Sequence, residues 1–102
     1  PFYMMITVKM YNEAGKFAEN KEIAKTIRTK LIIPNLENNN MIVFDFNHIE
    51  GCTQSFIHTL LSKPIRDFRE TAFNNLLYQN ANQDVKKIIS IVYRYMQESL
   101  DE

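Results

Sequence analysis

The feature of this sequence that most constrains its fold is a short apolar run near the middle of the chain, Met41 to Phe46. Odd and even positions of this run are both apolar until Asp45, so a strand formed by it has two apolar faces. Such a strand suits the centre of a sheet that is buried from both sides, which is the usual setting of parallel strands. The run therefore predicts the central strand of a parallel sheet.

The residues before this run predict a strand followed by a helix. Met4 to Tyr11 alternates between apolar and polar positions with the period of two that is typical of a strand, and residues 12–16 break it. Asn20 is a suitable N-cap for a helix over residues 21–31. Pro34 cannot continue that helix, so we expect residues 35–40 to form a loop.

The residues after the central strand predict a turn and a second helix. The turn covers residues 47–52, with Gly51 as its flexible point. Thr53 is the expected N-cap of the second helix, and Pro64 predicts that this helix ends near Ser62.

A third strand and a last helix complete the predicted fold. Within residues 70–78, the pairs Ala72-Phe73 and Leu76-Leu77 are the apolar positions that favour a strand. Asn80 or Asn82 caps the last helix, whose apolar stripe is formed by Val85, Ile88, Ile89, Val92 and Met96. The order β-α-β-α-β-α predicts a small single α/β domain over residues 1–102, with a mostly parallel sheet flanked by helices. A sheet of three strands also leaves an edge that a helix, the N-terminal segment or a partner chain has to cover.

Composition narrows the classes of partner. The 102 residues contain 12 basic and 12 acidic side chains, so no net charge favours nucleic acid as a partner. No apolar run approaches the roughly 20 residues that span a bilayer, so we expect no membrane insertion. Cys52 is the single cysteine, and the sequence lacks the Cys/His spacing of a zinc site. We therefore expect a cytoplasmic domain without metal or cofactor.

The segment that joins the central strand to the second helix resembles a known family. An apolar strand, an Asp-Phe pair, a further apolar position and a Ser-Phe pair that opens a helix are found here as Ile42 to Phe44, Asp45-Phe46, Ile49 and Ser55-Phe56. This pattern resembles the STAS-like domains of unknown function. It is also similar to the related STAS domains of anti-sigma factor antagonists, in which a strand ending in Asp leads to a phosphorylatable Ser at the helix start.

The resemblance implies a regulatory domain that binds a partner protein and has no catalytic activity. Ser55 matches the phosphoacceptor serine of the antagonists, and Asp45 matches their strand-end aspartate. This chain has Thr-Gln-Ser followed by Phe where the antagonists have Asp-Ser-Ser followed by Gly. The implied partner is an ATPase-fold kinase or an anti-sigma-like regulator. The residues expected to contact it are Thr53, Gln54, Ser55, Phe56 and His58.

The physical chemistry of a helix start supports a switch at Ser55 and also allows a simpler interpretation. The first turn of a helix has free N–H groups, and its dipole stabilises a nearby anion by about 0.3–1 kcal/mol. A phosphate on Ser55 would be tolerated there and would repel an acidic or apolar partner surface. In the simpler interpretation, Thr53 and Ser55 only cap the helix. Asp45 at the strand end is expected to accept hydrogen bonds from loop N–H groups.

Other residues suggest further functions. Cys52 and His58 are a possible nucleophilic pair, but Cys52 has no Lys or Arg close in sequence to lower its pKa, so we expect an inert thiol. Lys63, Arg66 and Arg69 form a basic stretch that is either solvated surface or a flank of the Ser55 loop.

Two alternative functions remain at this stage. Pro1 superficially resembles the N-terminal catalytic base of the tautomerase family. The rest of the chain does not resemble that family, so we prefer to interpret residues 1–3 as a purification-tag remnant. A self-associating structural domain is the other alternative, because an uncovered sheet edge favours association between copies.

Overall fold

The computed structural model describes residues 3–101 of the chain, so Pro1 and the tautomerase interpretation lie outside the described residues. In chain order the elements are β1 (Met5–Lys9), α1 (Met10–Ala14), β2 (Phe17–Ala18), α2 (Lys21–Ile27), the π-helix η1 (Arg28–Ile32), α3 (Ile33–Glu37), β3 (Met41–Asp45), β4 (Gly51–Cys52), α4 (Gln54–Phe68), α5 (Glu70–Asn75), β5 (Leu76–Gln79) and α6 (Gln83–Leu100). Within this part of the chain, no helix is long and apolar enough to cross a membrane.

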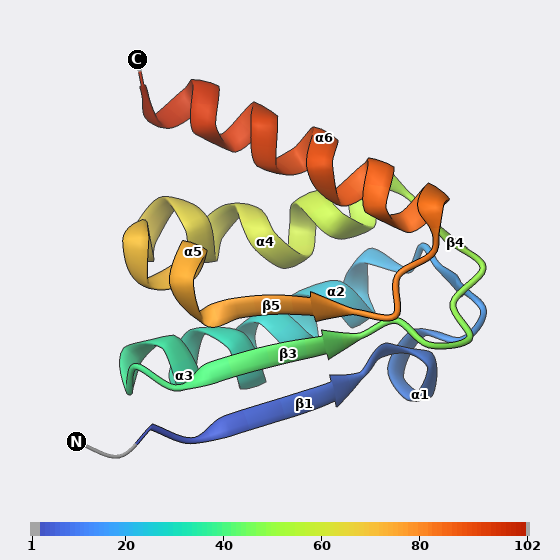
Figure 1. Cartoon of the computed structure of the whole chain (residues 1–102), viewed down its shortest axis with the longest axis horizontal. Helices are drawn as coiled ribbons and strands as arrows, with labels where there is room; N and C mark the ends of the chain where they lie inside the picture. Colours follow the sequence, from blue (N-terminus) through green and yellow to red (C-terminus); the bar gives the residue numbers. More distant parts are fainter. Residues whose placement is uncertain (1–2, 102) are drawn as a thin grey trace.

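The main sheet has the strand order β1-β3-β5, and all of its pairs are parallel. The predicted α/β class and the central position of Met41 to Asp45 are therefore confirmed. Both connections step across the sheet in the same direction, and right-handed crossovers then carry the helices to the same face. Figure 1 shows the resulting two layers, with the strands in front of α2 and α3 and with α6 packed on α4.

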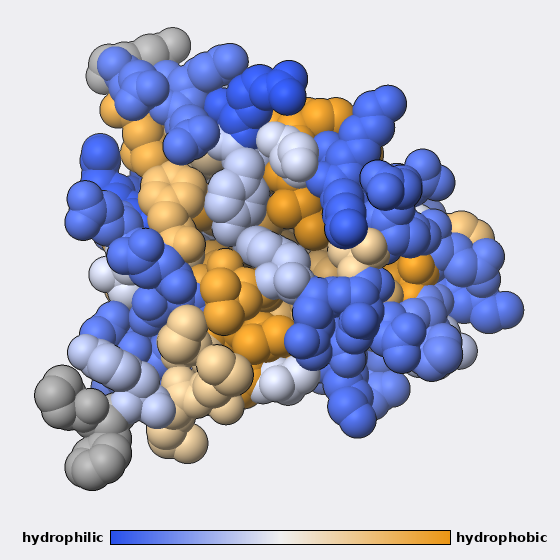
Figure 2. All heavy atoms as spheres, viewed as in Figure 1, coloured by the Kyte–Doolittle hydropathy of each residue, from blue (hydrophilic) through white to orange (hydrophobic). Residues whose placement is uncertain are grey.

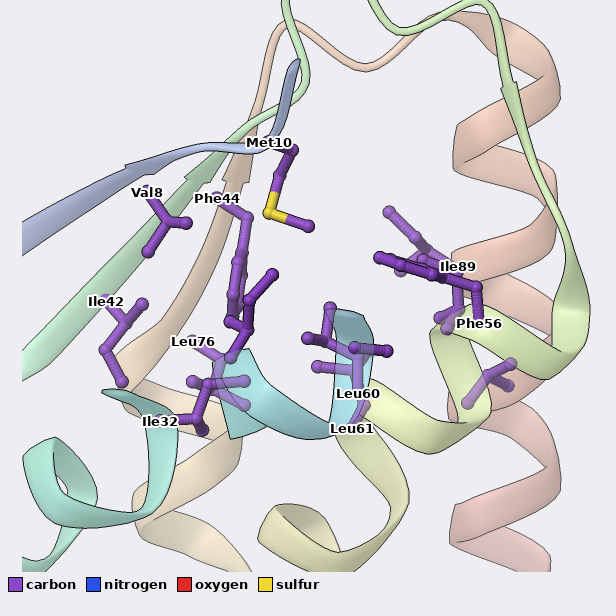
Figure 3. Packing of buried hydrophobic residues seen from close by; sticks show 14 of the residues in the cluster. Val8, Met10, Ile32, Ile42, Phe44, Phe56, Leu60, Leu61, Leu76 and Ile89 are labelled. Atoms are coloured by element: carbon purple, nitrogen blue, oxygen red, sulfur yellow. The ribbon is translucent and has the colours of Figure 1, made fainter. Parts of the chain in front are cut away.

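One face of the sheet and the helices form the hydrophobic core. Alternate strand side chains point toward the helices, among them Val8, Ile42 and Phe44 (Figure 3). They meet Leu60, Leu61 and Phe56 of α4, Ile32 of η1 and Ile89 of α6. The final helix begins after Asn82, whose Oδ1 accepts from the Val85 amide at 2.9 Å, as predicted.

Both predicted helix ends at prolines are wrong. The helix that begins at Lys21 continues through the wider turn of η1 into α3, and Pro34 lies in the first turn of α3, directly after that wider turn. Helix α4 passes Pro64 and ends at Phe68. An interior proline costs about 3 kcal/mol. Burial of Pro64 and Ile65 against the core, worth about 1.5–3 kcal/mol per large side chain, offsets that cost.

Other boundaries also differ from the prediction. The first strand ends at Lys9, level with the end of β3 at Asp45, and one helical turn, α1, begins at Met10, whose side chain is buried in the core. The third strand starts at Leu76, and Ala72-Phe73 belongs to helix α5. Strands β2 and β4 pair in a second parallel sheet of two strands, which the sequence pattern did not reveal.

Candidate functional site

The predicted partner-binding residues lie at the start of α4. Thr53 is the N-cap, and its Oγ1 accepts from the Phe56 amide at 3.0 Å. Thr53, Gln54 and Ser55 are exposed, and His58 is half-buried one turn further along the helix. Phe56 is fully buried in the core, so its side chain is not available to a partner in this fold. Its predicted role in partner contact is therefore corrected to a structural one.

A groove between α4 and α6 brings three of these residues together. Gln54, Ser55 and His58 form one wall, and Val92 and Tyr95 of α6 form the other. The groove is open and encloses about 390 Å³. The imidazole of His58 meets the ring of Tyr95 edge to face, with centroids 5.9 Å apart and planes at 78°. Tyr95 is 59% exposed, so its ring is open to solvent at this wall.

The residues of the second wall of this groove were only partly predictable from the sequence. Val92 belongs to the predicted apolar stripe of the last helix, and Tyr95 follows it at the i, i+3 spacing that places two residues on neighbouring turns. An aromatic residue beside such a stripe either packs or lines a surface. Nothing in the sequence pattern indicates that α6 lies against the start of α4, because this contact depends on how the helices stack.

The loop after β3 is held by Asp45, as expected. Its Oδ1 accepts from the backbone N–H of Asn47 and from Nδ2 of Asn80, each at 2.9 Å. The hydrogen bonds from Asn80 and from the Asn47 amide lower the pKa of the Asp45 carboxyl, which therefore stays ionised. Asn80 ties this loop to the end of β5, so Asp45 has a structural role in joining two strand ends.

The residue of that loop with a left-handed backbone is His48, whereas Gly51, which we predicted as the flexible point, lies in β4. His48 has φ +72°, in the left-handed region, while Gly51 pairs with Phe17 in the small sheet of β2 and β4. A Cβ at Gly51 would lie 3.5 Å from the Phe17 ring, which is an ordinary van der Waals contact, so the packing does not require glycine here. His48 meets Tyr11 edge to face at 5.7 Å, and both line a polar crevice of about 250 Å³ at the carboxyl ends of β1 and β3.

The structure does not support a nucleophilic role for Cys52. Burial raises the pKa of its thiol to about 11, so almost no thiolate forms at neutral pH. Its expected partner His58 contacts Tyr95. Between residues 3 and 101, three or more His, Cys, Asp or Glu side chains do not gather in an arrangement that would hold a metal ion.

The basic stretch does not flank Ser55. Lys63 lies about 12 Å further along α4 at a rise of about 1.5 Å per residue, and Arg69 follows the last turn of that helix. The Lys63 ammonium is also paired with Asp67 at 2.9 Å. All three cations are exposed, in keeping with the interpretation as solvated surface. The alternative, a flank of the Ser55 loop, is wrong because it assumed that the helix ends before them.

Comparison with known proteins adds one finding. The model of the family described as "STAS-like domain of unknown function (DUF4325)" matches residues 23–86, from α2 to the first turn of α6. This range contains the central strand, the Asp45 loop and the start of α4. No curated protein and no solved structure matches the chain.

Proposed function

We propose that this chain, which belongs to the family of STAS-like domains of unknown function, is a non-catalytic domain that binds a partner protein through the groove between α4 and α6. The observation that carries the proposal is the position of Gln54, Ser55 and His58. These residues were selected from the sequence alone, and they line the same groove as the exposed ring of Tyr95.

The chemistry of the groove suits insertion of a partner side chain. On the wall formed by α6, Val92 is apolar, and Tyr95 offers a large face with a polar end. Tyrosine is over-represented among the residues that contribute most to binding, because it buries a large area and loses little conformational entropy. Ser55 and Gln54 supply hydrogen-bonding groups at the rim. A volume of about 390 Å³ accepts one or two side chains, so a partner protein must also contact the surrounding helix surfaces.

Phosphorylation of Ser55 is the proposed control of this binding. Ser55 is exposed in the first turn of α4, where N–H groups without intrahelical acceptors tolerate a phosphate. The added charge of nearly −2 would fill the rim of the groove and repel an apolar or acidic partner. By its resemblance to the antagonists, the partner is an ATPase-fold kinase or an anti-sigma-like regulator.

The test is affinity capture from the source cells, with intact-mass measurement of the recovered chain. We expect a specific partner for the unmodified chain and loss of that partner in Ser55→Glu and in Tyr95→Ala. Gln83→Glu is the matched control, because it adds the same charge to the first turn of α6 at a residue that does not line the groove.

Three results would contradict the proposal or a part of it. Capture that is equal for the wild type, Ser55→Glu and Tyr95→Ala would exclude the groove as the binding surface. Equal loss in Gln83→Glu would mean that charge at any helix start disturbs binding. A mass increase of one phosphate that remains in a Ser55→Ala variant would place the modification at another residue.

A further inference from the structure

One face of the main sheet is not covered by the helices. Side chains of β1, β3 and β5 that point away from the core form this open face: Met5, Thr7, Lys9, Met41, Val43, Asp45, Leu77 and Gln79. Val43 is 7% exposed but is absent from the core cluster, because its side chain lies on the other side of the sheet. Figure 2 shows hydrophobic atoms gathered over the strands on this face, which is turned to the viewer.

An open face of this kind is unusual for parallel strands. Parallel sheets almost always have both faces covered. Here Met5 is 61% exposed, and Tyr3 and Met4 next to it are 56% and 64% exposed. The exposed apolar side chains are thus concentrated at β1 and the residues that lead into it, beside Met41 and Val43 of the central strand.

The register of the strands makes this face complementary to itself. Met5 is the neighbour of Met41, Thr7 of Val43, and Lys9 of Asp45. A two-fold axis parallel to the strands, between β1 and β3, would lay each of these residues over its register neighbour in another copy. Methionine then meets methionine, and Lys9 of each copy meets Asp45 of the other. We propose that a second copy of this chain covers the open face in a symmetric, face-to-face dimer.

The charges at the end of the face support this occupant. In the described part of the chain Lys9 makes no salt bridge, and both hydrogen bonds to Asp45 end on Oδ1, which leaves Oδ2 for a new donor. A second copy supplies a cation for Asp45 and an anion for Lys9 through the same operation. Any other occupant would need an acidic group placed opposite Lys9 and a basic group placed opposite Asp45.

The area of the face sets the expected strength of the dimer. Three strands of about five residues give a surface of about 16 by 14 Å. Stable complexes bury about 800 Å² on each partner, several times this flat area. Tyr3, two residues before Met5, enlarges the contact, but we expect a weak dimer that forms reversibly between micromolar and millimolar concentration.

Analytical ultracentrifugation of the purified chain tests the proposal. We expect the sedimentation coefficient of the wild type to rise with protein concentration. The sedimentation coefficient of Met5→Lys should stay at the value of a monomer at every concentration. Phe17→Lys is the matched control, since Phe17 is 57% exposed but lies on β2, outside the face. If circular dichroism shows that Met5→Lys is unfolded, Thr7→Arg places a charge on the same face and gives the same test.

The charge pairs are tested separately. Lys9→Glu should weaken the dimer about tenfold or more, because it places two carboxylates together, and the exposed Lys30→Glu should not.

A wild type that stays monomeric at millimolar concentration, or a dimer that Met5→Lys leaves intact, would overturn the proposal and leave the face to another kind of partner. Tyr95→Ala, which removes a wall of the groove, should leave the sedimentation unchanged, so failure of either proposal is distinguishable from failure of the other.

Discussion

The pair formed by Tyr78 and Tyr93 allows a quantitative test of how the last helix is attached to the sheet. Their hydroxyl oxygens are 2.6 Å apart, and the rings meet edge to face. Tyr78 is also stacked on Phe44 of the central strand, with centroids 5.4 Å apart. This hydrogen bond therefore connects β5 and the core to α6, which supplies a wall of the proposed binding groove.

Removing one hydroxyl should cost more than removing both. Tyr93→Phe leaves the hydroxyl of Tyr78, the more deeply buried of the two, without its partner, and we expect a loss of about 1–3 kcal/mol in unfolding free energy. Tyr78→Phe leaves the hydroxyl of Tyr93, which lies nearer to water, so we expect a smaller loss of about 0.5–1.5 kcal/mol. The double variant removes both polar groups from the same space and should lie within about 1 kcal/mol of the wild type.

Urea unfolding of the four proteins measures these differences. Thermal unfolding is a second assay, in which a loss of 1 kcal/mol in unfolding free energy lowers the melting temperature by about 4–8 °C for a domain of this size. The expected result is a favourable coupling energy of about 1–2 kcal/mol between the two positions. Additive losses, with the double variant less stable than either single variant, would refute the argument that the two hydroxyls satisfy each other.

The same pair predicts a dependence of stability on pH. Burial raises the pKa of Tyr78 well above its ordinary value of 10, and burial also raises the pKa of Tyr93. The unfolded chain therefore loses these protons at a lower pH than the folded chain. The contribution of the pair is fully present below pH 10 and declines above it as the unfolded phenols ionise. The double variant with Tyr78→Phe and Tyr93→Phe should lack the part of the loss of stability that these two phenols cause.

Three smaller predictions concern the ends of α4 and the thiol beside its start. Thr53→Ala should lower the unfolding free energy by about 0.5–2 kcal/mol in urea unfolding, because the Phe56 amide loses its cap, and Thr53→Ser should retain most of it. Cys52 should react with a disulfide reagent at neutral pH more slowly than free cysteine, with a rate that rises toward pH 11, and fast reaction would contradict its burial. Arg69→Gly should raise the unfolding free energy by about 0.5–1 kcal/mol because φ is +47°, whereas Arg66→Gly inside the helix should lower it by about 1 kcal/mol.

The order of the main elements was predictable because local patterns determine it. The two apolar faces of Met41 to Asp45 identify a central strand, and the caps at Asn20, Thr53 and Asn82 identify helix starts. A capping side chain acts on amides two or three residues away, so the sequence alone contains the whole interaction.

The predicted helix ends were wrong because they depend on contacts between residues that are distant in the sequence. Pro34 and Pro64 disfavour a helix locally, but helix formation beyond them is decided by burial against elements that are distant in the sequence. The two-stranded sheet of β2 and β4 was also missed, because two residues are too few to produce a periodic pattern.

The residues of the candidate site also fall into those that local sequence determines and those that tertiary packing determines. Thr53, Gln54, Ser55 and His58 follow from the helix start, which is a local feature. Tyr95 joins them only because α6 packs against α4, and Phe56 leaves them because the same packing buries it. A sequence pattern can indicate which stretch of chain carries a site. Which side chains of that stretch face the solvent depends on the stacking of the helices.

The two proposed surfaces have a common origin in the connections of the sheet. Because both crossovers run in the same direction, the helices gather on one face, where α4 and α6 leave a groove between them, and the other face of the sheet stays open. A dimer through the open face uses the strands and leaves the groove of each copy free. Such a dimer would present two grooves, and a partner with two matching sites would bind it with higher avidity than it binds a single copy. Met5→Lys should then weaken capture of a bivalent partner without altering any residue of the groove, whereas Tyr95→Ala should abolish capture in the monomer and in the dimer.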